Sequence, residues 1–138
     1  MKRILRSIFG VVAGLILVSM LVEGLEFGLV TAIHGKPTKD PVVYFAIRNQ
    51  GWFLGFKLVY NTAAAVVGGF VAAWIAGYAP VKHGVALAIV QTLAFGWALT
   101  QPDVRQTTPD WAWLALIVVS FAGIVWGARL RARRRVAG

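Results

Sequence analysis

Four long apolar segments, separated by short connectors that carry most of the charged residues, dominate this sequence. The hydrocarbon core of a bilayer is about 30 Å thick, so a helix needs roughly 20 apolar residues to cross it. The alternating segments of about ten residues that are typical of membrane β-barrels do not occur. We therefore expect an all-α single domain, a membrane bundle of four transmembrane helices over about residues 7–33, 52–78, 83–99 and 110–128.

Lys and Arg residues are distributed unequally between the two sides of such a bundle. The more basic side holds Lys2, Arg3, Arg6, Lys82, Arg129, Arg131, Arg133, Arg134 and Arg135. The other side holds Lys36, Lys39, Arg48 and Arg105. Because Lys and Arg are enriched in cytoplasmic segments, we expect both termini in the cytoplasm.

The basic N-terminus followed by an apolar run also resembles a secretory signal peptide. A signal peptide would end in small residues at its cleavage site. Here Met20, Leu21 and Val22 occupy that position, and the apolar run continues to Ile33. We interpret the segment as an uncleaved first helix.

The first connector contains the signals for one helix end and one helix start. Gly35 and Pro37 end the first span, and Asp40-Pro41 is typical of an N-cap followed by proline at the first helical position. The apolar residues after Pro41 predict a short helix in the outer interface.

Aromatic residues lie near the predicted span ends, where they are expected to form two belts at the headgroup level. The outer group is Trp52, Phe53, Trp97, Trp111 and Trp113, and the inner group is Trp74, Tyr78 and Trp126. Stacking on a ligand is the alternative interpretation. His83, next to Lys82, is expected at the inner boundary.

Small residues recur at every fourth position of the second span, among them Gly68, Gly69, Ala73 and Gly77. Helices in lipid pack closely where small residues let their backbones approach. The same spacing recurs in the pairs Gly10/Gly14, Gly24/Gly28 and Gly123/Gly127. The pattern predicts helix packing within the bundle, and a homodimer contact is the alternative.

Ionisable residues inside the spans are the candidates for function. Glu23 and Glu26 share one face of the first span, and Lys57 can reach the same depth from the antiparallel second span. Lys57 is expected to pair with Glu23 or Glu26. His34 lies near the face of Glu23. The complete expected intramembrane cluster is Glu23, Glu26, Lys57, Asn61 and Gln91, with Thr92 nearby.

Three interpretations of this cluster remain open: an ion-pair network that fixes helix register, a proton or small-solute pathway, and a metal or hydrolytic site on Glu23, Glu26 and His34. The last lacks the Glu-x-x-His pattern of di-iron bundles, and one His does not complete a zinc set. No phosphate loop, nucleophile elbow or dinucleotide motif occurs, and the chain has no cysteine. We expect no catalytic residue, no metal and no cofactor.

We expect the Arg-rich C-terminal tail to contact anionic lipid headgroups at the cytoplasmic face and to fix the orientation of the chain in the membrane. Its residues are Arg129, Arg131, Arg133, Arg134 and Arg135. An acidic protein partner and nucleic acid are the alternatives, and we expect no nucleic acid.

Several stretches resemble a group of small, uncharacterised bacterial four-helix membrane proteins. They are Arg3-x-x-Arg6 with the segment 11–15, Glu23 with His34-Gly35, Asp40-Pro41, the Gly/Ala string 68–77, and Pro109-Asp110-Trp111-Ala112-Trp113 with the basic ending. The resemblance covers nearly the whole chain and implies four spans in a bacterial inner membrane. It implies no activity and no functional residue, and Trp74 stands where that pattern has a polar residue.

Taken together, these features predict a non-enzymatic, multi-pass membrane protein that is structural or accessory, or a subunit of a larger membrane complex. Its expected partners are the lipid bilayer and a second copy or another membrane protein. The alternative is a small channel or transporter that acts through Glu23, Glu26 and Lys57.

Overall fold

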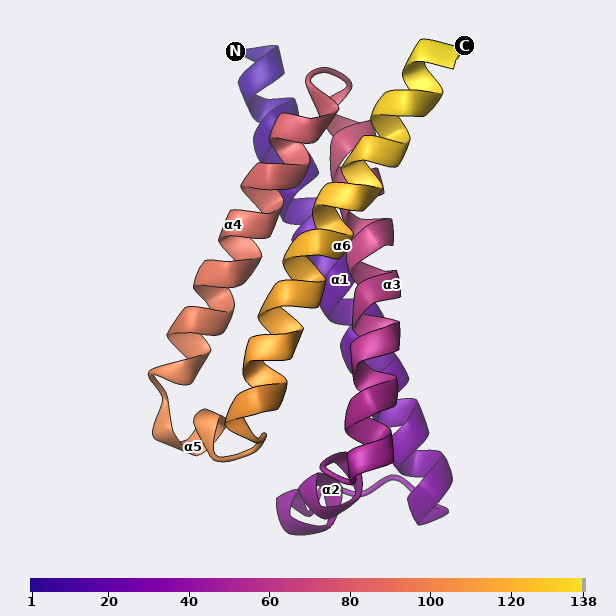
Figure 1. Cartoon of the computed structure of the whole chain (residues 1–138), viewed down its shortest axis with the longest axis vertical. Coiled ribbons are helices and arrows are strands. Elements are labelled where there is room, and N and C mark those ends of the chain that lie inside the picture. Colours follow the sequence, from indigo (N-terminus) through magenta and orange to yellow (C-terminus); the bar gives the residue numbers. More distant parts are fainter. Residues whose placement is uncertain (138) are drawn as a thin grey trace.

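The computed structural model describes residues 1–137, apart from the side chains of residues 135 and 137. This part of the chain consists of helices and connecting loops (Figure 1). In chain order the helices are α1 (Lys2–His34), α2 (Pro41–Arg48), α3 (Gly51–Ala76), α4 (Pro80–Leu99), α5 (Pro102–Arg105) and α6 (Asp110–Ala137).

Four of the described helices, α1, α3, α4 and α6, are long and apolar enough to cross a membrane. This finding confirms the predicted all-helical fold with four apolar helices. Figure 1 shows both chain ends at one end of the bundle and α2 and α5 at the opposite end.

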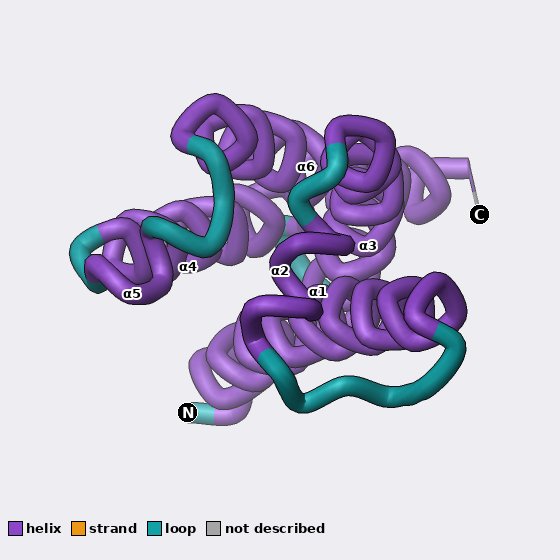
Figure 2. Tube along the Cα trace, turned by 90° about the horizontal axis from the view of Figure 1, so that it is seen from below, coloured by secondary structure: helices purple, strands orange, loops and turns teal. Residues whose placement is uncertain are grey.

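Helix α3 lies at the centre of the bundle, where it packs against α1 and α6, while α4 packs mainly against α6. Seen from the α2 end, α2 lies between the ends of α1 and α3 (Figure 2). The fully buried core contains Ala65, Ala72, Leu87, Ala88 and Ile124. These side chains are mostly small, so the helices are close together.

Glycines make the closest helix contacts. A Cβ atom on Gly69 would lie 2.0 Å from the backbone oxygen of Ile124 in α6, and one on Gly68 would lie 2.2 Å from Cγ2 of Val18 in α1. Ala73 is also buried in this interface. Opposing glycines with similarly tight surroundings are Gly10 and Gly14 in α1 and Gly123 and Gly127 in α6. The small residues of α3 therefore lie at helix–helix contacts, as the spacing predicts.

Gly77, predicted to pack helices with the same set, lies just beyond the end of α3, where a Cβ atom would lie 2.8 Å from Nη2 of Arg6 in α1. It follows the last residue of α3 with a φ of 74°, and its N–H donates to the carbonyl oxygen of Ala73. This left-handed conformation suits glycine and ends a helix, and Pro80 opens the next one. Gly24 and Gly28 have open space where a Cβ would stand, so this pair packs against nothing within the described chain.

Several helix boundaries differ from the expected spans. Helix α1 begins at Lys2 rather than near residue 7, and α6 continues through the basic tail to Ala137 rather than ending near Ala128. Lys and Arg are good helix formers whose long side chains extend beyond an apolar segment to water. The sequence therefore shows where the apolar run ends, but not where the helix ends.

The short helix predicted after Asp40 is present as α2. Asp40 Oδ1 accepts a hydrogen bond of 2.9 Å from the Val42 N–H, and Pro41 occupies the first helical position. The expectation that Trp113 and Phe53 belong to an exposed aromatic belt is wrong, because both are buried. The Trp113 ring packs edge-on against Phe95 of α4, with 6.0 Å between the ring centroids.

Candidate functional site

The carboxylate of Glu26 is surrounded by two cations and two hydroxyl groups. Arg48 Nε lies 3.0 Å from Oε1, and Lys57 Nζ donates to Oε2. The Tyr44 hydroxyl donates to Oε1 and the Tyr60 hydroxyl to Oε2, each at 3.2 Å. We call these five residues the Glu26 cluster.

Three helices bring the Glu26 cluster together. Glu26 lies on the part of α1 nearest α2, and Lys57 and Tyr60 are three residues apart on one face of α3. Tyr44 and Arg48, one turn apart on α2, come from the connector between these helices. The cluster therefore ties the first connector to both of the helices that it joins.

Arg48 also contacts the C-terminal half of the chain. Its Nη2 donates to Thr108 Oγ1 at 2.7 Å, and the neighbouring Asn49 Nδ2 donates to the Thr107 carbonyl oxygen at 2.7 Å. Thr107 and Thr108 lie in the loop between α5 and α6. These two hydrogen bonds join the first and third connectors at the same end of the bundle.

The charged residues of the Glu26 cluster are buried. Glu26, Arg48 and Lys57 are each less than 10% exposed, and two positive charges face one negative charge. Burial and the negative charge of Glu26 raise the pKa of Tyr44 to about 12, so this phenol is a neutral hydrogen-bond donor. Three hydrogen bonds reach the carboxylate, from Tyr44, Lys57 and Tyr60, and Arg48 adds a positive charge at 3.0 Å without a hydrogen bond from its Nε.

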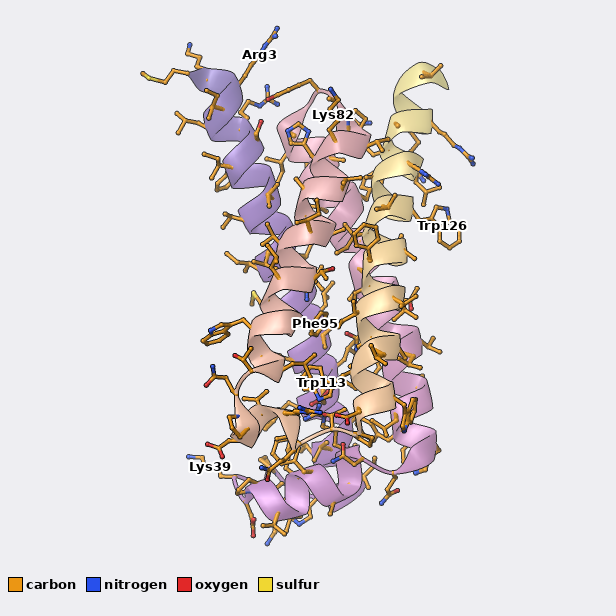
Figure 3. The ribbon with its side chains drawn as sticks, turned by 60° about the vertical axis from the view of Figure 1, so that its left-hand side comes forward. Arg3, Lys39, Lys82, Phe95, Trp113 and Trp126 are labelled. Carbon is orange, nitrogen blue, oxygen red and sulfur yellow. The ribbon has the colours of Figure 1, made fainter. Side chains whose placement is uncertain are left out.

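A cavity of about 250 Å³ lies beside the cluster, between the four long helices. Glu23, Asn61 and Gln91 line it together with members of the cluster, and Phe95 and Trp113 form part of its apolar wall. Figure 3 shows the last two side chains close together, in the half of the bundle that contains α2. Gln91 Oε1 is buried and has no hydrogen-bond partner.

The residues of the expected intramembrane cluster have different surroundings in the structure. Of the two carboxylates considered for Lys57, the structure pairs Glu26, whereas Glu23 is exposed and the ion pairs of the described residues do not include it. Asn61 Nδ2 donates to the carbonyl oxygen of Lys57 on its own helix. Gln91 contributes only to the cavity wall.

The neighbouring candidates bond to their own backbone segments instead. His34 Nδ1 bonds the carbonyl oxygen of Lys36, at 3.0 Å, so His34 does not join the Glu26 cluster. Thr92 Oγ1 donates to the Ala88 carbonyl oxygen of its own helix.

Sequence reasoning missed Tyr44, Arg48, Tyr60 and Thr108. The sequence places Arg48 only among the basic residues of the first connector. The available signal was its position: an Arg that ends a short helix can turn back toward a carboxylate. The two tyrosines carry no charge and therefore did not stand out.

The basic tail lies far from this cluster. Its residues continue α6 beyond the apolar segment, at the end of the bundle that holds both termini (Figure 1). The guanidinium of Arg134 lies 5.5 Å from the centre of the Phe70 ring. The side chain of Arg135 lies outside the described residues.

The geometry of the Glu26 cluster favours an electrostatic and structural role, since its buried carboxylate is paired with two cations and accepts from two hydroxyl groups. Among the described residues, no three His, Asp or Glu side chains come together as metal ligands. The resemblance to small bacterial membrane proteins stays a prediction. Comparison with protein-family models, with curated proteins and with solved structures finds no match for this chain.

Proposed function

We propose that this chain is a non-catalytic accessory subunit of a larger membrane complex, in a bacterial inner membrane and with both termini in the cytoplasm. The Glu26 cluster holds its helices in register. Glu23 is the contact point for another membrane helix that carries a hydrogen-bond donor or a positive charge.

The exposed carboxylate of Glu23 is the observation that carries this proposal. Lys57 lies six residues, or about 9 Å, from the start of α3, and it pairs with Glu26 of α1. Glu23 lies about one helical turn from Glu26 along α1, farther from the end of the bundle that contains α2. Glu23 therefore lies within the apolar part of α1, and it has neither of the ion pairs that Glu26 makes. A charge at that depth is unfavourable by a few kcal/mol unless a partner or water compensates it.

Co-purification tests this proposal. In mild detergent we expect a second membrane protein to remain bound at a fixed ratio, and Glu23→Gln to lower the bound fraction at least tenfold. The physical reason is the loss of one charge pair in a poorly solvated interface. A photo-reactive residue in place of the exposed Met20, one turn away, should cross-link to a segment of that protein that contains Lys or Arg.

Asp103→Asn is the matched control, because Asp103 is an exposed carboxylate on the short helix α5. It should leave the bound fraction unchanged. If Glu23→Gln and Asp103→Asn behave alike, Glu23 is not the contact.

A transporter is the second candidate, and the cavity with the unpartnered Gln91 Oε1 favours it. Purified protein alone in liposomes would then carry a proton or solute flux that Glu23→Gln abolishes. An accessory subunit produces no such flux.

Labelling of single cysteines tests the proposed orientation, and the native chain has none that would interfere. With both termini in the cytoplasm, cysteines at Lys39 and Gln106 should react with an impermeant reagent in intact cells. A cysteine at Lys82 should react only after permeabilisation. The reverse pattern would overturn the orientation.

A further inference from the structure

The net charge of the chain is concentrated at one end of the molecule. All five carboxylate side chains lie in the half that contains α2 and α5: Glu23, Glu26, Asp40, Asp103 and Asp110. Five basic side chains lie in the same half: Lys36, Lys39, Arg48, Lys57 and Arg105. The formal charge of +9 therefore resides at the end with both termini, where the sequence supplies no acidic side chain to compensate it.

A groove of about 600 Å³ runs between α1 and α4 at this positive end. Ile8 and Val12 of α1 and Ala86 and Val90 of α4 form its apolar walls. Ile8 and Val12 are 56% and 45% exposed, so the groove is open to the surroundings of the bundle. In a bilayer those surroundings are acyl chains.

Three polar side chains close the groove at its charged end. His83 Nδ1 donates to the Ala79 carbonyl oxygen at 3.0 Å, and His83 Nε2 lies 3.0 Å from Ser7 Oγ. Ser7 Oγ also bonds the Tyr78 hydroxyl. These groups satisfy one another and hold α1 against the turn between α3 and α4.

Two cations, one lining the groove and one beside Tyr78, remain available. Lys82 lines the groove, is exposed, and has no hydrogen bond or ion pair from its side chain within the described part of the chain. Arg3 lies at the same end of the bundle (Figure 3), with its guanidinium 5.9 Å from the centre of the Tyr78 ring. Both can approach an anion without breaking an ion pair.

We propose that this groove binds one anionic phospholipid, with an acyl chain between α1 and α4 and the phosphate beside Lys82 and Arg3. The apolar walls fit the chain, and the uncompensated positive charge selects an anionic headgroup over a zwitterionic one. The site is independent of Glu23 and of any partner protein, so it stands whether or not the proposed function does.

Lipid retention tests the site. The purified protein in mild detergent is incubated with dioleoyl phosphatidylglycerol or dioleoyl phosphatidylcholine, washed, and weighed by native mass spectrometry. We expect one phosphatidylglycerol to be retained and phosphatidylcholine to be lost. Val12→Trp, which fills the groove, should lower retention at least tenfold. Lys82→Gln should lower the preference for phosphatidylglycerol about fivefold, the effect of one charge near a membrane surface.

Val67→Trp and Lys39→Gln are the matched controls. Val67 is 45% exposed, as Val12 is, but lies on α3, and Lys39 lies at the opposite end of the bundle. Both should retain the lipid as the native chain does, and all variants should show the same helical circular dichroism. Equal loss in Val12→Trp and Val67→Trp, equal retention of the two lipids, or displacement by millimolar inorganic phosphate would each overturn the proposal.

Discussion

Glu26→Gln is expected to lower the free energy of unfolding by about 3–5 kcal/mol, the typical effect of removing one side of a buried ion pair. The substitution leaves Arg48 and Lys57 buried close together with no negative charge between them. Lys57→Met should have a smaller effect, because Arg48 still compensates Glu26. Unfolding of the purified protein in detergent, followed by circular dichroism, measures these differences.

The double variant Glu26→Gln with Lys57→Met should be more stable than Glu26→Gln alone, since it removes the repulsion between the two cations. Glu23→Gln is the matched control, because it makes the same chemical change one turn away at an exposed carboxylate. It should not lower the stability of the isolated chain and should raise it to the extent that water does not already compensate the unpaired charge. A loss as large as that of Glu26→Gln would show that the Glu26 cluster does not hold the helices together.

Gly69→Ala is expected to destabilise the bundle by about 1–3 kcal/mol, and Gly69→Leu by more, because overpacking a close contact forces the backbones apart. The added Cβ would lie 2.0 Å from the backbone oxygen of Ile124, which no side-chain rotation can relieve. The measurement is again the unfolding transition in detergent.

Gly24→Ala provides the matched control, and its effect should have the opposite sign. Gly24 lies in α1 with nothing within 4 Å of the position of a Cβ atom. Alanine there should stabilise the helix by up to about 1 kcal/mol through its higher helix propensity. Val67→Leu, a volume increase at an exposed position of α3, should be neutral. Similar losses at Gly69 and Gly24 would remove the argument for close packing.

The fold could be predicted because bilayer thickness sets the length of an apolar helix. Four apolar runs of sufficient length gave four helices, and Asp40-Pro41 gave the start of α2. The limits of α1 and α6 could not be predicted from hydropathy, since Lys and Arg continue a helix as readily as apolar residues do. Gly77 fitted the four-residue spacing, yet Pro80 three residues later was the stronger sign of a helix end.

The candidate site was only partly predictable. Glu23 and Glu26 are three residues apart, which rotates them by about 60° around the helix axis, and both could face Lys57. The way in which α1 and α3 pack against each other determines that Glu26, and not Glu23, pairs with Lys57. No local sequence pattern indicates the angle between these helices. Arg48 depends on the path of a whole connector, so its contact with Glu26 required the three-dimensional structure.

The segregation of charge also has a consequence for voltage and for assembly. One elementary charge that crosses a membrane potential of 100 mV changes the free energy by about 2.3 kcal/mol. Inverting one copy would carry the +9 end across that potential, at a cost of about 20 kcal/mol. In the proposed orientation the positive end lies on the electrically negative side of the membrane, so we expect neighbouring copies to share one orientation and a homo-oligomer to be parallel.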